Sequence, residues 1–382
     1  MKNKHNNRMK KYFALLIVLL LFFTLTSQKV YAEDYTLTVI TRNGEYVFTY
    51  PDIHCKNGEY KLKDEFNKIE KIVEDSYVSP KDAKLKVDKT CGKISVIADE
   101  NGRRINGIEL KESIDYALKN KKEKVVAVYE DVYADICKSY LDRCLNLRGK
   151  FSTDYSSSID ERKHNIELAV SKINGVILKS GEVFSFNKTV GQRTEENGFK
   201  NAKIIENGVF VEGLGGGVCQ VSSTVYNALL LSGMEIKEYH PHSLSVSYVE
   251  KSFDAMVSYG WADLKYVNST NGYSVLLAKA DGKKIDVEIY GVKNEYCYER
   301  ESVTTEEIPF TTKLIDSEEV ETDKSYVKVK GKNGYKSEGY LKIYKNGKLI
   351  EKKLIRKDKY NSVEEITLQG KDATVKNLKK LK

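Results

Sequence analysis

The sequence predicts a multidomain α+β protein with a mixed α/β N-terminal module, an α+β central domain and an all-β C-terminal module. Roughly 350 residues follow the first 32, more than one hydrophobic core usually organises, so two or three domains are expected. Runs that alternate apolar and polar residues, as strands do, are interspersed with runs of helical period. The abundance of Tyr, Val and Ile, with only 4 Pro, also favours sheet.

Residues 1–32 have the pattern of a secretory signal peptide. A basic start is followed by the apolar run 12–23 and by Val30-Tyr31-Ala32, a small-residue cleavage site. The apolar run is short for a bilayer span, and retention as an N-terminal membrane anchor is the alternative. We therefore expect a secreted or cell-envelope protein, with a membrane as partner only if this segment is retained.

The formal charge of +8 does not indicate a nucleic-acid partner. Six basic residues and no acidic one lie within 1–32, so the remaining chain carries about +2. A charge this small predicts no binding to nucleic acid.

The N-terminal module is expected at 33–148. Strand-like runs alternate there with amphipathic stretches, which is typical of an α+β module. The strand-like runs are 35–40, 83–87, 93–98 and 124–129, and the helical stretches are 62–74 and 110–118.

The central domain, expected at 149–298, carries the candidate nucleophile. A helical run at 159–173 precedes short strands, and three consecutive glycines, 215–217, precede Val218-Cys219 and an apolar helix at 220–231. Cys219 then lies at the first turn of a buried helix, where the helix dipole and unpaired backbone N–H groups favour a thiolate. The same N–H groups can hold a developing oxyanion. The alternative is a buried cysteine with no chemical role.

Two histidines could activate this thiol. His240 and His242 lie in "EYHPHSLSVSYV", before an alternating run expected to form a strand that ends near Val249. We prefer His242 as the base, because the strand would fix its direction. Asp254 or Asp263 could orient the imidazole, and spacing alone does not choose between them.

We expect further residues near Cys219 to contact substrate, and no metal or cofactor to take part. The two histidines lack a third ligand at a matching spacing. Among the other cysteines, Cys55 could pair with Cys91, and Cys137, Cys144 and Cys297 offer one more bridge. The expected substrate-binding residues are Gly215, Gly216, Gly217, Gln220, Ser222, Ser223, Arg193 and Tyr248.

The C-terminal module is expected at 299–371, followed by a basic tail at 372–382. Asn-Gly pairs at 333–334 and 346–347 lie between alternating runs and predict hairpins. The module has no His or Cys, so it is not expected to catalyse nucleophilic chemistry itself. Its removal is therefore expected to spare turnover of small soluble substrates.

Four motifs in the central domain resemble the VanW domain, over roughly 149–291. They are "GEVFSFNKTVGQRTEENGF", "GGGVCQVSSTVYNAL", "HPHS" and "FDAMVSYGWADLKYVN". Some VanW-domain proteins look like L,D-transpeptidases with a cysteine nucleophile. The resemblance thus implies that Cys219 is the nucleophile and His242 its partner. The family usually has Arg before the residue matching His240; this chain has Tyr239, and Arg193 or Arg162 could supply that charge.

The flanking modules resemble wall-binding domains. The stretch "ADENGRRINGIELKESIDYAL", at 98–118, resembles part of a peptidoglycan-binding domain. The segment "EEIPFTTK" and the glycines at 331, 334, 347 and 370 resemble the five-glycine (G5) domain, thought to bind wall polysaccharide. Peptidoglycan stem peptides and glycan are the partners that these resemblances imply.

The resemblance implies a peptidoglycan L,D-transpeptidase that cross-links stem peptides through a Cys219 thioester. Two alternatives stay open. A cysteine hydrolase of the same stems, an endopeptidase or carboxypeptidase, also places a cysteine on a helix and a histidine on a strand. In a non-catalytic wall-binding protein, 215–219 would be only a tight turn.

Overall fold

The computed structural model describes residues 35–206 and 209–370. The expected signal peptide at 1–32 and basic tail at 372–382 lie outside the described residues. The chain divides into two compact units. The first combines the chain before Ala83 with Asp99–Asp135, and the second combines Ala83–Ala98 with the chain from Ile136 onward.

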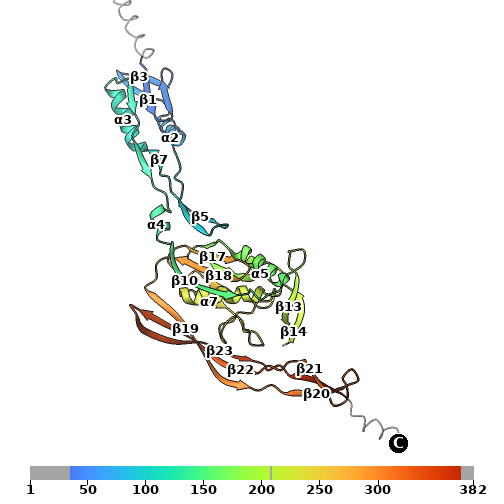
Figure 1. The fold of residues 1–382 in the computed structure, drawn as a ribbon. Coiled ribbons are helices and arrows are strands. Elements are labelled where there is room, and N and C mark those ends of the chain that lie inside the picture. The colour runs from blue at the N-terminus through green and yellow to red at the C-terminus, as the bar shows by residue number, and fades with distance from the viewer. Residues whose placement is uncertain (1–34, 207–208, 371–382) are drawn as a thin grey trace, which may run out of the picture. The chain divides into compact units, whose positions relative to one another are not determined.

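In the first unit, a small sheet and two helices enclose one core (Figure 1). Leu37 and Val39 of the central strand and Ile114 of the longer helix are fully buried. Strand order is β2-β1-β8, with β1 and β8 parallel. The elements are β1 (Leu37–Thr41), β2 (Gly44–Phe48), β3 (Ile53–Lys56), β4 (Glu59–Leu62), α2 (Glu65–Asp75), β7 (Gly102–Ile105), α3 (Gly107–Lys119), β8 (Lys124–Val126) and β9 (Tyr129–Val132).

The boundaries of the N-terminal module differ from those expected. The run 124–129 is not one strand, because β8 ends at Val126 and β9 begins at Tyr129. The hairpin of β5 (Lys84–Asp88) and β6 (Lys93–Ile97) groups with the second unit. The Lys89 carbonyl there accepts a hydrogen bond from Asn174 Nδ2 at 3.0 Å.

A four-stranded antiparallel sheet, ordered β10-β18-β17-β11, is the framework of the second unit. Along β18, Ile285, Val287 and Ile289 alternate into the core and are fully buried. Helix α7 packs on β10 and β18, and α5 packs on β17 and on α7 (Figure 1). The elements are β10 (Asn146–Asp154), α5 (Asp160–Ile173), β11 (Val176–Leu178), α7 (Val218–Ser232), β17 (Ser274–Ala280) and β18 (Lys284–Gly291).

Shorter elements surround this framework. Strands β12, β16 and β15 form a second sheet in that order, and β13 and β14 form a separate hairpin. Their bounds, with two short helices, are α4 (Lys138–Asp142), β12 (Val183–Ser185), α6 (Phe186–Val190), β13 (Asn201–Glu206), β14 (Val209–Leu214), β15 (Glu235–Glu238) and β16 (Lys265–Val267).

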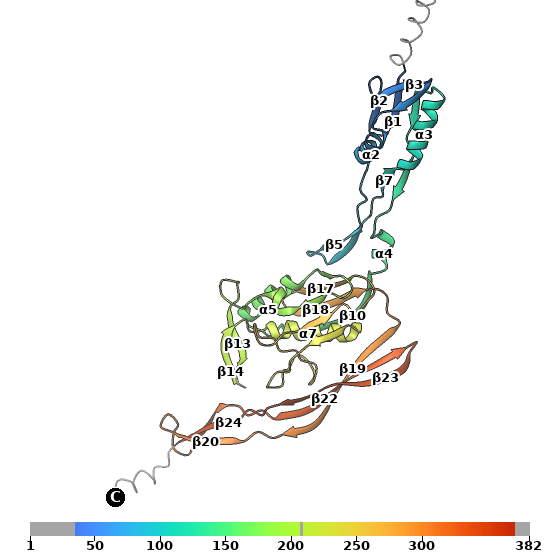
Figure 2. The ribbon, with the colours of Figure 1, turned by 180° about the vertical axis from the view of Figure 1, so that it is seen from behind.

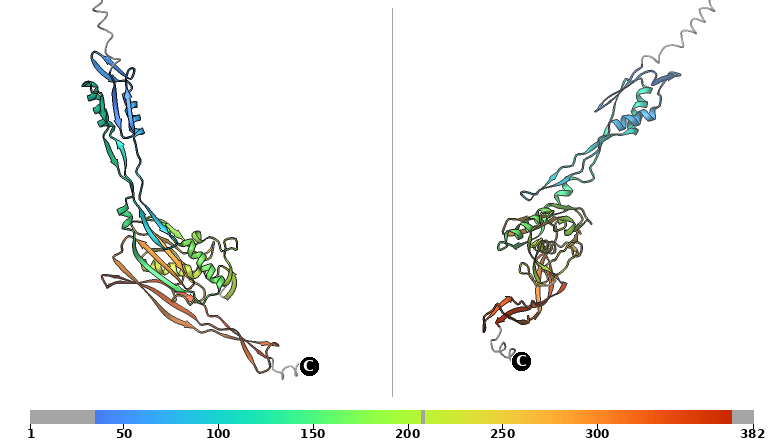
Figure 3. Two further views of the ribbon diagram at one scale, coloured as in Figure 1. Left: turned by 45° about the horizontal axis from the view of Figure 1, so that its top comes forward. Right: turned by 90° about the vertical axis from the view of Figure 1, so that its right-hand side faces the viewer.

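The C-terminal strands form two sheets, drawn in orange to red (Figures 2 and 3). We call β19-β22-β23 the inner sheet, because β19 packs on α7, and β20-β24-β21 the outer sheet. The bounds are β19 (Tyr296–Ile308), β20 (Thr312–Ser317), β21 (Ser325–Val329), β22 (Gly334–Lys345), β23 (Lys348–Tyr360) and β24 (Glu365–Gly370).

One of the two expected hairpin turns is present. Asn346 and Gly347 join β22 to β23 with φ of 51° and 75°, the left-handed geometry that suits Asn-Gly. The other expected turn, at 332–334, does not make a hairpin. It connects β21 of the outer sheet to β22 of the inner sheet, so the Asn-Gly signal there marks a change of sheet.

Candidate active site

Cys219 is the second residue of α7, as the sequence predicts. Gly217 precedes the helix with φ of 103°, which residues with a Cβ rarely adopt. A Cβ on Gly216 would lie 2.7 Å from the Lys203 carbonyl oxygen, so only glycine allows the β13–β14 hairpin to approach this closely. The glycines therefore shape the entry to the helix, and the partly buried thiol lies at its first turn.

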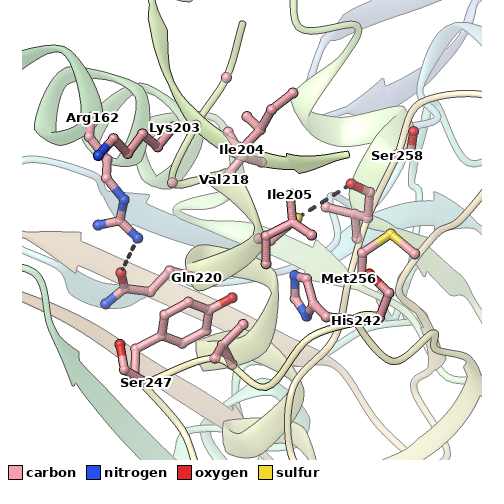
Figure 4. A pocket seen from close by; sticks show the side chains of 18 of the residues that line it. Arg162, Lys203, Ile204, Ile205, Val218, Gln220, His242, Ser247, Met256 and Ser258 are labelled. Carbon is pink, nitrogen blue, oxygen red and sulfur yellow. Dashed lines mark hydrogen bonds between the residues drawn. The ribbon is translucent and has the colours of Figure 1, made fainter. Parts of the chain in front are cut away.

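The structure brings Cys219, His242 and Asp254 together. The His242 Nδ1 and backbone N lie 2.6 and 2.7 Å from Asp254 Oδ2. With Nδ1 engaged, the other ring nitrogen of His242 is available to the thiol of Cys219, with which His242 interacts electrostatically. The Cys219 Sγ itself lies 3.5 Å from the Val257 carbonyl oxygen. His242 points into the pocket that the thiol lines (Figure 4). The order of these three groups is the one that a nucleophile, a base and an orienting carboxylate take in known catalytic triads.

The electrostatics of the three groups favour an ion pair. Burial raises the pKa of the Cys219 thiol, but the hydrogen bond and charge of His242 outweigh it and lower the pKa. Burial lowers the pKa of His242, but Asp254 and Cys219 raise it to about 9. Burial raises the pKa of Asp254, and His242 with Arg356 and Tyr360 brings it below its ordinary value. Both shifts move the pair toward a thiolate and an imidazolium.

His242 is held differently from what the sequence predicted. Residues 241–250 form no strand, so alternation does not set its direction. Instead, one carboxylate oxygen of Asp254 accepts hydrogen bonds from both its backbone and its ring. Ser222 and Ser223, which are fully buried, hold the neighbouring Ala255 against α7: Ser222 Oγ donates to the Ala255 carbonyl at 2.6 Å, and Ser223 Oγ accepts from its N–H at 2.9 Å.

The structure also supplies two residues that the sequence reasoning missed. Tyr360 Oη donates to Asp254 Oδ1 at 2.6 Å, and Arg356 Nη1 donates to the Asp254 carbonyl at 2.6 Å. Both lie on β23, within the module that was expected to stand apart from the site. No local motif marks them, because the contact joins positions about a hundred residues apart.

The other candidate orienter and base have different partners. Asp263 accepts hydrogen bonds from Ser185 Oγ at 2.5 Å and from the Asn187 N–H at 2.8 Å, at the start of α6. His240 Nε2 lies 3.1 Å from Glu238 Oε1, and its ring lies beside that of Trp261. The geometry thus separates these residues from Cys219, His242 and Asp254.

A cavity of about 1410 Å³ opens over the thiol. Arg162 donates to Gln220 Oε1 at 2.7 Å along one wall (Figure 4). The Nη2 atom of Arg193 is buried and has no hydrogen-bond partner among the described residues. Expected substrate-binding residues that line the cavity are Gly215, Gly216, Gly217, Gln220, Arg193 and Tyr248, whereas Ser222 and Ser223 lie in the core behind Cys219.

All six cysteines fall in the described part of the chain, and none of them forms a disulfide there. The pairings considered from the sequence are therefore not formed in this structure. Within 35–206 and 209–370, no helix combines the length and hydropathy that a bilayer crossing requires.

Three family models match successive parts of the chain. They are "Putative peptidoglycan binding domain" at 60–127, "VanW like protein" at 161–290 and "G5 domain" at 299–372. All three domains expected by resemblance are thus found. The peptidoglycan-binding and VanW matches indicate a function related to the cell wall, and the G5 match adds to the case for wall association outside the cytoplasm.

Two curated relatives share part of the sequence. "Uncharacterized protein YoaR" of Bacillus subtilis (strain 168) is 40% identical over 142 residues, covering 37% of this chain and 47% of the relative. "Vancomycin B-type resistance protein VanW" of Enterococcus faecalis (strain ATCC 700802 / V583) is 30% identical over 152 residues, covering 37% of this chain and 54% of the relative. The chain thus spans about half the length of these relatives.

Two solved structures match a fifth of the chain. "IgA1 Protease G5 domain structure" is 21% identical, covers 21% of this chain and 94% of its own, and has a TM-score of 0.16. "Crystal structure of HP0197-G5" is 22% identical, covers 20% of this chain and 100% of its own, and has a TM-score of 0.14.

Proposed function

We propose that the central domain is a cysteine-dependent L,D-transpeptidase that cross-links the stem peptides of peptidoglycan. The observation that carries the proposal is the series Cys219, His242 and Asp254, of which Cys219 and His242 line an open cavity and Asp254 is buried behind them. A nucleophile paired to a buried, oriented base is the arrangement of covalent acyl transfer. The peptidoglycan-binding and VanW matches support the wall as the source of the substrate.

The reaction would proceed in two acyl transfers. The Cys219 thiolate attacks the carbonyl carbon of the third stem residue, and the positive end of the α7 helix dipole stabilises the oxyanion. The His242 imidazolium then gives its proton to the departing amine of the terminal D-alanine, leaving a thioester. An acceptor amine loses a proton to His242 and attacks the thioester carbon, which forms the new amide and releases the thiolate.

Arg193 is the residue we assign to the donor carboxylate. The departing D-alanine carries a free carboxylate, and Arg193 lines the cavity with a buried, unpartnered Nη2. Guanidinium groups bind carboxylates through paired hydrogen bonds. The Nη1 of Arg193 donates a hydrogen bond to the Gly191 carbonyl at 3.0 Å, so the side chain is oriented before substrate binds.

The test is to incubate the purified chain with defined muropeptides and to measure product masses. Dimers that lack one terminal D-alanine per bond are expected from the wild-type chain and from Cys91→Ala, whose thiol is exposed. Cys219→Ser should form none while unfolding at the wild-type temperature. Trimmed stems without dimers would show a hydrolase, and an inert wild-type chain that binds walls would show a binding protein.

A further inference from the structure

Strand β23 of the inner sheet brings two buried side chains to the carboxylate that orients His242. Tyr360 is 1% exposed and Arg356 is 4% exposed. Tyr360 Oη lies 2.6 Å from Asp254 Oδ1, and Arg356 Nη2 lies 3.4 Å from the same oxygen. His242 is hydrogen-bonded to the other carboxylate oxygen, Oδ2. One oxygen of Asp254 therefore contacts the histidine, and the other contacts β23.

Arg356 and Tyr360 add to the stabilisation that His242 gives the charge of Asp254. Asp254 is fully buried, and an ionised carboxylate without partners in such a place takes up a proton. A protonated Asp254 would no longer stabilise the imidazolium of His242. The guanidinium of Arg356 is in turn held in place by two neighbours. Its Nε donates to Asp358 Oδ2 at 2.6 Å, and its central carbon lies 4.8 Å from the Tyr239 ring centroid.

The inner sheet also holds the backbone on either side of the site. Tyr360 Oη accepts a hydrogen bond from the Ser252 N–H at 2.7 Å, and Ser252 has a left-handed φ of 64°. The Asn361 N–H donates to the carbonyl of Ser243, the residue after His242, at 2.7 Å. A Cβ on Gly339 would meet the Ser252 carbonyl oxygen at 3.0 Å, so β22 lies against the same segment.

We infer that Arg356 and Tyr360 are positioning residues of the active site: by holding Asp254, they make the inner sheet a working part of the cysteine centre. The inference rests on the proposed acyl-transfer role of Cys219. On this inference, the C-terminal module is not only a wall-binding module, because its inner sheet also contributes to the active site. A change on β23 should therefore alter the reactivity of a thiol that β23 does not touch.

The experiment measures the rate at which iodoacetamide alkylates Cys219 in the full chain, from pH 4 to 10, by peptide mass. This readout reports the thiolate and needs no substrate. We expect Tyr360→Phe to move the acid limb of the profile to higher pH and to slow alkylation at pH 6 about tenfold, as loss of a hydrogen bond to a charge should. Arg356→Gln should do the same, and Arg356→Lys should retain more of the reactivity.

The matched control is Tyr344→Phe, which removes the same hydroxyl from β22. Tyr344 Oη donates to the exposed Glu299 at 2.8 Å, away from Asp254, so its profile should follow that of the wild type. If Arg356→Gln does not fold, the nearly isosteric Tyr360→Phe still decides. A folded Tyr360→Phe with the wild-type profile would overturn the inference, even if its unfolding temperature were lower.

The same variants separate this inference from the proposed function. Loss of alkylation at pH 6 in Tyr360→Phe supports the positioning role whether or not muropeptides react. If the wild-type chain then made no product from any stem, only the transpeptidase assignment would fail. If muropeptides reacted and both β23 variants behaved as wild type, only the positioning role would fail.

Discussion

The inner and outer C-terminal sheets differ in what they bury, although both belong to one matched domain. The inner sheet places Arg356, Ser337 and Tyr360 against the central domain, each less than a tenth exposed. The outer sheet leaves large apolar side chains open, with Leu314 59% and Tyr326 63% exposed. One domain thus has two environments. We expect the inner sheet to serve the active site and the outer sheet to be the part open to the wall.

The largest expected effect comes from removing both sheets. A chain that ends before residue 299 should lose all turnover of soluble muropeptides, because Asp254 would lose the hydrogen bonds from Tyr360 and Arg356 and keep only those from His242. A chain that ends at Glu364 lacks β24, the middle strand of the outer sheet, together with residues 371–382. It should keep turnover within about twofold and lose binding to isolated walls, since such weak coupling is usual between distant sites.

Those two truncations test whether turnover depends on the inner sheet and wall binding on the outer sheet. Product masses from soluble stems and sedimentation with purified walls measure the two properties independently. Wild-type turnover by the shorter chain would show that the inner sheet is dispensable, as the sequence alone had suggested.

The next effect concerns the two histidines. His242→Ala should lower kcat/KM at least about a thousandfold, because the base and its link to Asp254 are lost together. His240→Ala should stay within about threefold, since its partner is Glu238 at 3.1 Å. Steady-state rates on a soluble stem peptide check this. The reverse ranking would reassign the base and leave Cys219 as nucleophile.

Stability should separate a buried ion pair of the inner sheet from an exposed one near the outer sheet. Arg356→Gln leaves Asp254 and Asp358 without their shared cation in the core, and should cost about 3–5 kcal/mol of unfolding free energy. Lys324→Gln breaks the exposed ion pair with Glu321 and should leave the free energy of unfolding unchanged. Urea unfolding measures the stability of both variants. An equal loss of stability in the two would contradict the expected difference between the buried and the exposed ion pair.

The smallest effect is expected at Arg193, which lines the cavity. Arg193→Lys keeps the charge but loses the paired geometry, so KM for the donor stem should rise about tenfold with little change in kcat. Lys188→Arg, on the exposed face of α6, is the control. An unchanged KM would show that another cation, such as Arg162, meets the carboxylate.

The position of the candidate nucleophile could be predicted from local sequence, whereas the partners of His242 and Asp254 depend on long-range packing. Three glycines before an apolar helix were sufficient to place Cys219 at a helix start, because the geometry of that turn is encoded within a few residues. The preference for His242 over His240 agrees with the geometry, but for another reason: the expected strand is absent, and a carboxylate twelve residues away fixes the ring.

Asp254 and Asp263 show why the orienting group could not be chosen in advance. Both are mostly buried acids beside aromatic and apolar residues, and nothing in their neighbouring sequence tells them apart. Their partners do, because Asp263 binds the start of α6 and Asp254 binds His242 and β23. The contribution of Arg356 depends on a contact that only the folded chain makes.

The distance along the chain between Asp254 and Tyr360 sets an order of events during synthesis. The thiol, the imidazole and the carboxylate leave the ribosome well before β23, 106 residues after Asp254. Until that strand docks, Asp254 lacks the hydrogen bonds of Tyr360 and Arg356. The positioning role that we propose for β23 therefore implies that Cys219 reaches its full reactivity only after β23 has been synthesised and has docked.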